Sequence, residues 1–115
     1  MTPPRRSVGL FLVERYLPVV DLDDLFASVS FAARVCDERR RVGATLRYLH
    51  STYVPGDETC FCLFEAESAQ DVNVLNADVG FRIDRISPAV SLDTRHDSSS
   101  TTRRQFVDNQ RKKLP

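Results

Sequence analysis

Three side chains in this sequence have the chemistry of a metal site: His50, Glu65 and Glu14. An imidazole nitrogen together with carboxylate oxygens forms a donor set that suits nickel, zinc, cobalt or manganese. A divalent ion of this kind takes about four to six donors, so one chain would supply only part of the set. Water or a second chain would have to provide the remaining donors.

Whether His50 and Glu65 can meet depends on the turn between two strand-like runs, residues 45–54 and 59–66. If Val54 and Thr59 are the last opposed pair, the loop has four residues, which is a common hairpin length. In this register His50 faces Leu63. Residues two apart on a strand point to the same side, so Glu65 becomes a diagonal neighbour of His50 on one face of the hairpin.

The same register places Tyr48 opposite Glu65. A register shifted by one residue would turn every side chain of one strand to the other face. His50 would then share a face with Cys62, and the site would be a softer one. We favour the first register because of its loop length, and we therefore expect a metal site built on His50 and Glu65, with Glu14 as a third candidate.

Each candidate also has a purely structural interpretation. An isolated histidine in a strand is often only a hydrogen-bonded residue of the core or its rim. Glu14 is followed by Arg15 and could mark a solvated strand end, and Glu65 has the same alternative. These alternatives stay open at the level of the sequence.

The three cysteines, Cys36, Cys60 and Cys62, point to core packing more than to a metal cage. Cys60 and Cys62 form a C-x-C pair, and alternate positions on a strand project both side chains to one face. A structural zinc cage needs four ligands, and no second pair of cysteines exists. Free cysteine is among the most buried residue types. Cys36 falls on the apolar side of a predicted helix.

The elements that must position these residues can be read along the chain. Runs of branched and aromatic residues predict strands at 8–16, 45–54, 59–66 and 85–92, the last containing Pro88, which indicates an edge or a bulge. Two helices are predicted between them, with Asp21 and Ser68 as N-caps and Gly43 and Gly80 after the last turns. Helical spacing predicts these inward residues: Leu22, Leu25, Phe26, Val29, Ala33 and Cys36 in the first helix, and Ala69, Val72, Leu75 and Val79 in the second.

The order strand, helix, strand, strand, helix, strand predicts an α+β fold of the ferredoxin-like βαββαβ type. Its four-stranded antiparallel sheet carries two helices on one face and leaves the other face open. The first strand is nevertheless apolar on both sides, with Leu10 and Leu12 opposite in direction to Phe11 and Val13. A large bare apolar face is uncommon in monomers, so we expect a homodimer through the open sheet face, with the tail or a ligand as alternative covers.

Length and charge agree with one small domain. The chain has 115 residues, which we divide into a lead-in at 1–7, a ferredoxin-like domain at 8–94 and a basic, disordered tail at 95–115. Residues 1–94 carry 10 Lys and Arg against 14 Asp and Glu, and residues 95–115 carry 6 against 2. The acidic domain argues against nucleic acid as the main partner, although the tail could contact it weakly. No apolar segment predicts a signal peptide or a membrane span, and a cytoplasmic location is expected.

Four strings in order resemble a family of small bacterial proteins described as nickel-binding or nickel-responsive. They are FLVERYLP (11–18), LRYLHSTYV (46–54), FCLFEAES (61–68) and FRIDRIS (81–87), and the similarity extends over roughly residues 9–92. The resemblance implies a dimeric ferredoxin-like protein with nickel as its possible metal. It implies no established reaction, and the first helix with its arginine-rich end is longer than is usual in the family.

The sequence therefore predicts a dimeric protein that binds nickel or a similar ion through His50, Glu65 and Glu14, and more an ion binder than an enzyme. One alternative is a cofactor-free or haem-related enzyme of the dimeric α/β-barrel type, argued from fold alone. In that case His50, Tyr48, Tyr16 and Glu14 would line a pocket as acid–base groups. A second alternative is an interaction module without chemistry. The sequence contains no phosphate-binding glycine loop, G-x-S-x-G or H-E-x-x-H motif.

Overall fold

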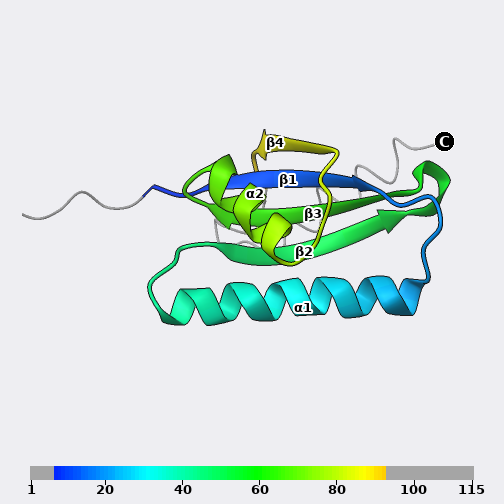
Figure 1. The fold of residues 1–115 in the computed structure, drawn as a ribbon. Helices are drawn as coiled ribbons and strands as arrows, with labels where there is room; N and C mark the ends of the chain where they lie inside the picture. Colours follow the sequence, from blue (N-terminus) through cyan, green and yellow to red (C-terminus); the bar gives the residue numbers. More distant parts are fainter. Residues whose placement is uncertain (1–6, 93–115) are drawn as a thin grey trace, which may run out of the picture.

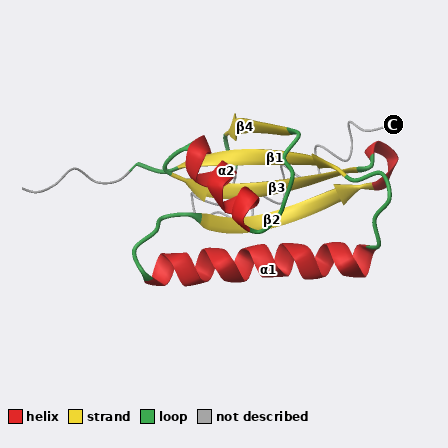
Figure 2. Ribbon diagram, viewed as in Figure 1, coloured by secondary structure: helices red, strands yellow, loops and turns green. Residues whose placement is uncertain are grey.

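The computed structural model describes residues 7–92 and contains the predicted order of elements. The elements are β1 (Gly9–Tyr16), α1 (Leu22–Arg41), β2 (Arg47–Val54), a 3₁₀ turn (Pro55–Asp57), β3 (Thr59–Ala66), α2 (Ala69–Asp78) and β4 (Arg85–Ala89). The strands lie in the order β2-β3-β1-β4, and every pair is antiparallel. This is the ferredoxin-like α+β fold that the sequence predicted (Figures 1 and 2). The tail at 95–115 and nearly all of the lead-in at 1–7 lie outside the described residues.

One face of the sheet forms the core together with the two helices. The burial of β3 alternates residue by residue: Cys60, Cys62, Phe64 and Ala66 are buried, and the residues between them are half-buried. α1 packs on β2, and α2 packs on β3 and β4 (Figure 1). We call this the helix-covered face and the opposite side the open face. No helix within residues 7–92 combines the length and the apolar character that a membrane crossing needs.

The helix ends follow local chemistry. The Asp21 side chain accepts hydrogen bonds from the backbone N–H groups of Asp23 and Asp24, at 2.8 and 3.1 Å, and so caps α1. The Ser68 hydroxyl oxygen accepts from the Asp71 N–H at 3.2 Å at the start of α2. After α1, Gly43 takes a φ of +105°, which a side chain would disfavour. Both predicted N-caps are confirmed.

The predicted apolar stripe of α1 is partly wrong. Leu25 and Cys36 are buried as expected, but Ala32 takes the place assigned to Ala33. Leu22 and Phe26 are 62% and 72% exposed. α1 has 20 residues and α2 only 10, so α2 cannot lie beside α1 along the whole length of α1. The N-terminal half of α1 therefore keeps apolar side chains at the surface.

The hairpin register is confirmed at His50, which pairs with Leu63, but the prediction that Tyr48 faces Glu65 is wrong. A β-bulge between Tyr48 and His50 inserts one extra residue into β2. Tyr48 therefore pairs with Phe64, and Arg47 pairs with Glu65. The bulge turns Tyr48 to the helix-covered face while His50 stays on the open face.

The last strand is shorter than predicted, since β4 ends at Ala89 and not at residue 92. It pairs with β1 only and forms an edge of the sheet. An edge is where Pro88 can be accommodated, because proline has no N–H to donate to a second neighbour. The edge interpretation of Pro88 is confirmed.

Candidate functional site

His50 and Glu65 lie on the open face as diagonal neighbours on two adjacent strands. His50 is exposed and pairs with Leu63. Glu65 is half-buried and follows Leu63 by two positions on β3, so both side chains project to the same side. Backbones at such diagonal positions are about 7–8 Å apart, a distance that an imidazole and a longer carboxylate side chain can bridge through one ion.

Glu14 lies apart from that pair. It pairs with Phe61, whereas Glu65 pairs with Leu10, so four residues separate the two carboxylates along the strands. At about 3.3 Å per residue this is roughly 13 Å. The Glu14 Oε2 atom instead lies 3.6 Å from Arg85 Nε in an ion pair. Within residues 7–92 no group of three or more His, Cys, Asp and Glu side chains is close enough to hold one ion.

The residues of the enzyme alternative do not form one pocket. Tyr48 lies on the helix-covered face, where its ring packs edge-on against that of Phe64 with centroids 5.6 Å apart. His50 lies on the open face. Tyr16 is 54% exposed on the open face. His50 lines none of the three described cavities, which have volumes of about 280, 180 and 320 Å³.

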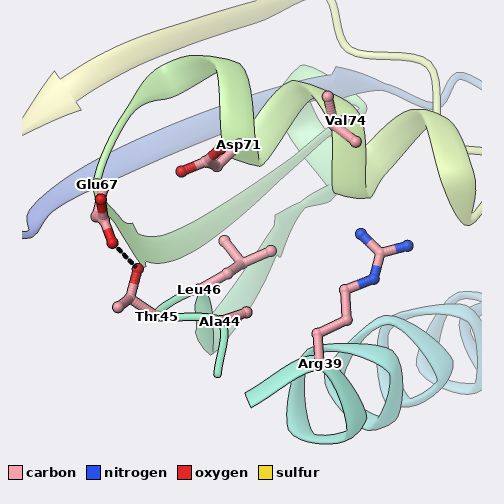
Figure 3. A pocket seen from close by; sticks show the side chains of 7 residues that line it. All are labelled: Arg39, Ala44, Thr45, Leu46, Glu67, Asp71 and Val74. Atoms are coloured by element: carbon pink, nitrogen blue, oxygen red, sulfur yellow. Dashed lines mark hydrogen bonds between the residues drawn. The ribbon is translucent and has the colours of Figure 1, made fainter. Parts of the chain in front are cut away.

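The cavity of about 280 Å³ lies between the end of α1, the segment that leads into β2 and the start of α2 (Figure 3). Its lining is of mixed charge, because it includes Arg39 together with the carboxylates of Glu67 and Asp71. Thr45 Oγ1 donates to Glu67 Oε1 at 3.0 Å, and Arg39 Nη2 donates to Asp78 Oδ2 at 2.6 Å. The first bond joins the segment before β2 to the segment before α2, and the second joins α1 to α2. These bonds therefore have a structural role.

A second group of polar side chains converges on the helix-covered face, around the sulfur of Cys62. The Ser51 hydroxyl donates to Cys62 Sγ at 2.9 Å, and the Cys60 and Cys62 sulfurs are 3.8 Å apart. Tyr48 Oη lies 2.6 Å from Ser51 Oγ and extends this chain of hydrogen bonds. We call Ser51, Cys60, Cys62 and Arg15 the thiol cluster.

Arg15 brings a permanent charge to the thiol cluster. It is only 7% exposed, its guanidinium carbon lies 3.7 Å from the centre of the Phe81 ring, and its Nε and Nη1 atoms have no hydrogen-bond partner. None of the ion pairs within residues 7–92 includes it. A buried guanidinium stays charged, so it strongly favours a negative charge beside it.

The cysteines respond to these neighbours in opposite ways. The pKa of Cys62 is lowered to about 6, first by the hydrogen bond from Cys60, then by those from Ser51 and Arg15 and by the charge of Arg15. The pKa of Cys60 is raised, because Cys60 holds the proton shared with Cys62 and is buried. Burial raises the pKa of Cys36 to about 11, because the cost of desolvation outweighs the nearby charge of Arg39 and the hydrogen bond from the Tyr48 backbone.

The thiol cluster was not predicted from the sequence, although a signal for it exists. Val13 and Arg15 are two apart on β1, and Cys60 and Cys62 are two apart on β3, so each pair shares a face. The interpretation of Cys60 and Cys62 as buried residues is confirmed. The sequence made no prediction for Arg15, and the pairing of Arg15 with the buried Cys60 shows that it lies on the helix-covered face.

The fold and its four-stranded antiparallel sheet define a ferredoxin-like α+β protein whose open face carries a histidine and carboxylates. The chain belongs to the family described as "Nickel responsive protein SCO4226-like", which it matches over residues 11–88. The crystal structure of SCO4226 from Streptomyces coelicolor A3(2) is similar, with a TM-score of 0.58 and 19% sequence identity. That similarity covers 75% of this chain and 100% of the other and supports the fold. The comparison with curated proteins gives no match.

Proposed function

We propose that this protein binds nickel or a similar divalent ion on the open face of its sheet, with His50 and Glu65 as ligands. The observation that carries the proposal is their diagonal placement on β2 and β3 in a chain that belongs to a nickel-responsive family. Imidazole and carboxylate together suit Ni²⁺. The metal would be held and not used in a reaction, because no acid–base group of the described residues accompanies His50 in a cavity.

Two donors are fewer than a divalent ion requires, and this supports a second part of the proposal, a homodimer through the open face. The half-buried apolar residues of this face are Leu10, Leu12, Val54, Phe61 and Leu63. A second copy packed on them would remove this apolar surface from water. It would also bring its own His50, Glu65 and Glu14 to the interface, so that Glu14 would complete a site across the dimer.

Calorimetric titration of the purified protein with nickel tests the metal site. We expect His50→Ala and Glu65→Gln to weaken nickel binding at least tenfold, because each removes one of few ligands. Thr52→Ala is the matched control, since Thr52 is exposed and lies two residues from His50 on the same face of β2. Equal affinity of the wild type and His50→Ala would remove His50 from the site.

Light scattering at tens of micromolar protein tests the dimer separately. We expect a dimer for the wild type and a monomer for Leu63→Glu, because a carboxylate in the centre of the open face would be buried without a partner. Phe26→Glu is the control, since Phe26 is an apolar residue exposed on α1, away from the open face. A monomeric wild type would contradict the dimer. A Leu63→Glu variant that stays dimeric, like the Phe26→Glu control, would contradict dimerisation through the open face.

A further inference from the structure

We propose that Cys62 is a nucleophilic thiolate that reacts with hydrogen peroxide, with Arg15, Ser51 and Cys60 as its positioning residues. The site lies on the helix-covered face, on the opposite side of the sheet from His50 and Glu65. It is therefore independent of the proposed metal and of the dimer.

The first argument is the number of donors aimed at one sulfur. Cys62 Sγ accepts from the Ser51 hydroxyl at 2.9 Å, lies 3.8 Å from the Cys60 thiol and is reached by the Arg15 guanidinium. A neutral thiol is a weak acceptor, whereas a thiolate gains from each donor. The cluster is built to hold negative charge on sulfur.

The second argument is the charge of Arg15. Its side chain is more than nine-tenths buried, and two of its three nitrogens have no partner, so its charge is neither solvated nor paired with a carboxylate among residues 7–92. The ionisable groups that interact with Cys62 are Arg15 of β1, Cys60 of β3 and Tyr48 of β2, and Cys36 of α1 interacts with Tyr48. Among the thiol and phenol groups of this region, only Cys62 has a lowered pKa. Its thiolate provides the counter-charge for Arg15.

The third argument is access. A cavity of about 180 Å³ lies between the N-terminal half of α1 and strands β2 and β3, in the region that the short helix α2 leaves uncovered. Its polar lining is Ser51, Tyr53 and Cys60, and its apolar lining comes from α1. Ser51 and Cys60 are the two residues directly joined to Cys62, so the reactive sulfur lies one side chain behind the cavity wall. A rotation of the Ser51 side chain would admit a molecule little larger than water.

The chemistry needs only the peroxide and the thiolate. The sulfur lone pair attacks one peroxide oxygen, the O–O bond breaks, and an S–O bond forms. The second oxygen leaves as hydroxide with the bonding pair and is protonated to water by the buffer of the bulk solvent. Sulfur is oxidised by two electrons to a sulfenic acid, and the peroxide is reduced to water. The donors around Cys62 favour this reaction because reactivity follows thiolate character.

The experiment exposes the reduced full-length protein to hydrogen peroxide at pH 7 in the presence of dimedone, which traps sulfenic acids. Labelled peptides are then quantified by mass spectrometry. Cys60 and Cys62 share one tryptic peptide, so the Cys60→Ser variant, which keeps a hydroxyl donor, assigns the label to Cys62. Cys36 is the internal reference, because it is equally buried, its pKa is raised and it lies in another peptide. We expect Cys62 to be labelled at least tenfold faster than Cys36.

Three variants test the role of the positioning residues. Arg15→Gln should slow labelling at least tenfold, and Arg15→Lys should restore part of the rate because it keeps the charge. Ser51→Ala should move the pH midpoint of the labelling rate upwards, a shift that a merely structural residue would not produce. It also keeps the test decisive if Arg15→Gln does not fold. Labelling of Cys62 as slow as that of Cys36, or an unchanged pH midpoint in Ser51→Ala, would overturn the proposal.

Discussion

The two faces of the sheet carry polar residues in different ways. On the helix-covered face, Arg15, Ser51, Cys60 and Cys62 come from three strands and converge on one sulfur. On the open face, His50, Glu65 and Glu14 are spread along the strands at intervals that strand geometry sets. Burial explains the difference, because polar groups enclosed without water must satisfy one another, whereas exposed ones are solvated. The cluster on the covered face is assembled within one chain, whereas the candidate ligands of the open face within residues 7–92 do not come together as a group of three.

The largest change in the free energy of unfolding should come from substituting a phenylalanine on the covered face, compared with one on the open face. Phe64 is 1% exposed in the core, and Phe64→Ala should lower the free energy of unfolding by about 3–5 kcal/mol, through lost burial and the cavity left behind. Phe61→Ala, on the open face, should cost less than half as much, because its side chain is only half-buried in one chain. Urea unfolding at low micromolar protein measures both values, and equal losses would contradict the separation of the two faces.

The order and pairing of the elements could be predicted from the sequence because they depend on local signals. The loop at residues 55–58 fixed the pairing of His50 with Leu63, and caps such as Asp21 marked the helix starts. The bulge between Tyr48 and His50 could not be predicted, because one inserted residue leaves no mark on a strand that is already mixed in polarity. Its consequence is large, since it moves Tyr48 to the opposite face from His50.

The candidate sites were less predictable than the fold because they depend on contacts between strands. Glu14 and Arg15 are adjacent in the sequence, yet one pairs with Arg85 at the surface and the other is buried beside Cys62. A charge at a strand end is usually solvated, so the sequence alone gives no indication that Arg15 is buried. Likewise, helical spacing placed Phe26 inside, and only the mismatch in length between α1 and α2 exposes it.

The second prediction concerns pH and the covered face. The pKa of Cys62 is lowered to about 6 in the folded chain, against about 8.5 for an ordinary thiol, so the unfolded chain binds more protons between these values. The stabilisation from the thiolate is fully present above about pH 8.5 and is lost as the pH falls through 6. At 1.36 kcal/mol per pKa unit, this difference in pKa amounts to about 3–4 kcal/mol. The raised pKa values of Cys36 and Cys60 act only at higher pH.

Denaturant unfolding of the wild type and Cys62→Ser at pH 6 and pH 8.5 measures this effect. The wild type should lose stability at the lower pH, and Cys62→Ser should lose much less, because serine does not ionise in this range. Parallel changes in the two proteins would show that Cys62 is protonated in the fold, and the contrast between the faces would then rest on geometry alone.

The smallest effect should come from the open face, where Glu14 and Arg85 form an ion pair with 3.6 Å between Oε2 and Nε. The Glu14 side chain is 28% exposed and that of Arg85 is 71% exposed, so solvent screens their attraction. Glu14→Gln should therefore change the free energy of unfolding by no more than about 0.5 kcal/mol, and the change should disappear in about 1 M salt. A cycle with Arg85→Gln isolates the pair. The cycle is measured at a protein concentration at which light scattering shows a monomer, and a coupling that persisted in salt there would contradict the solvent screening of this pair.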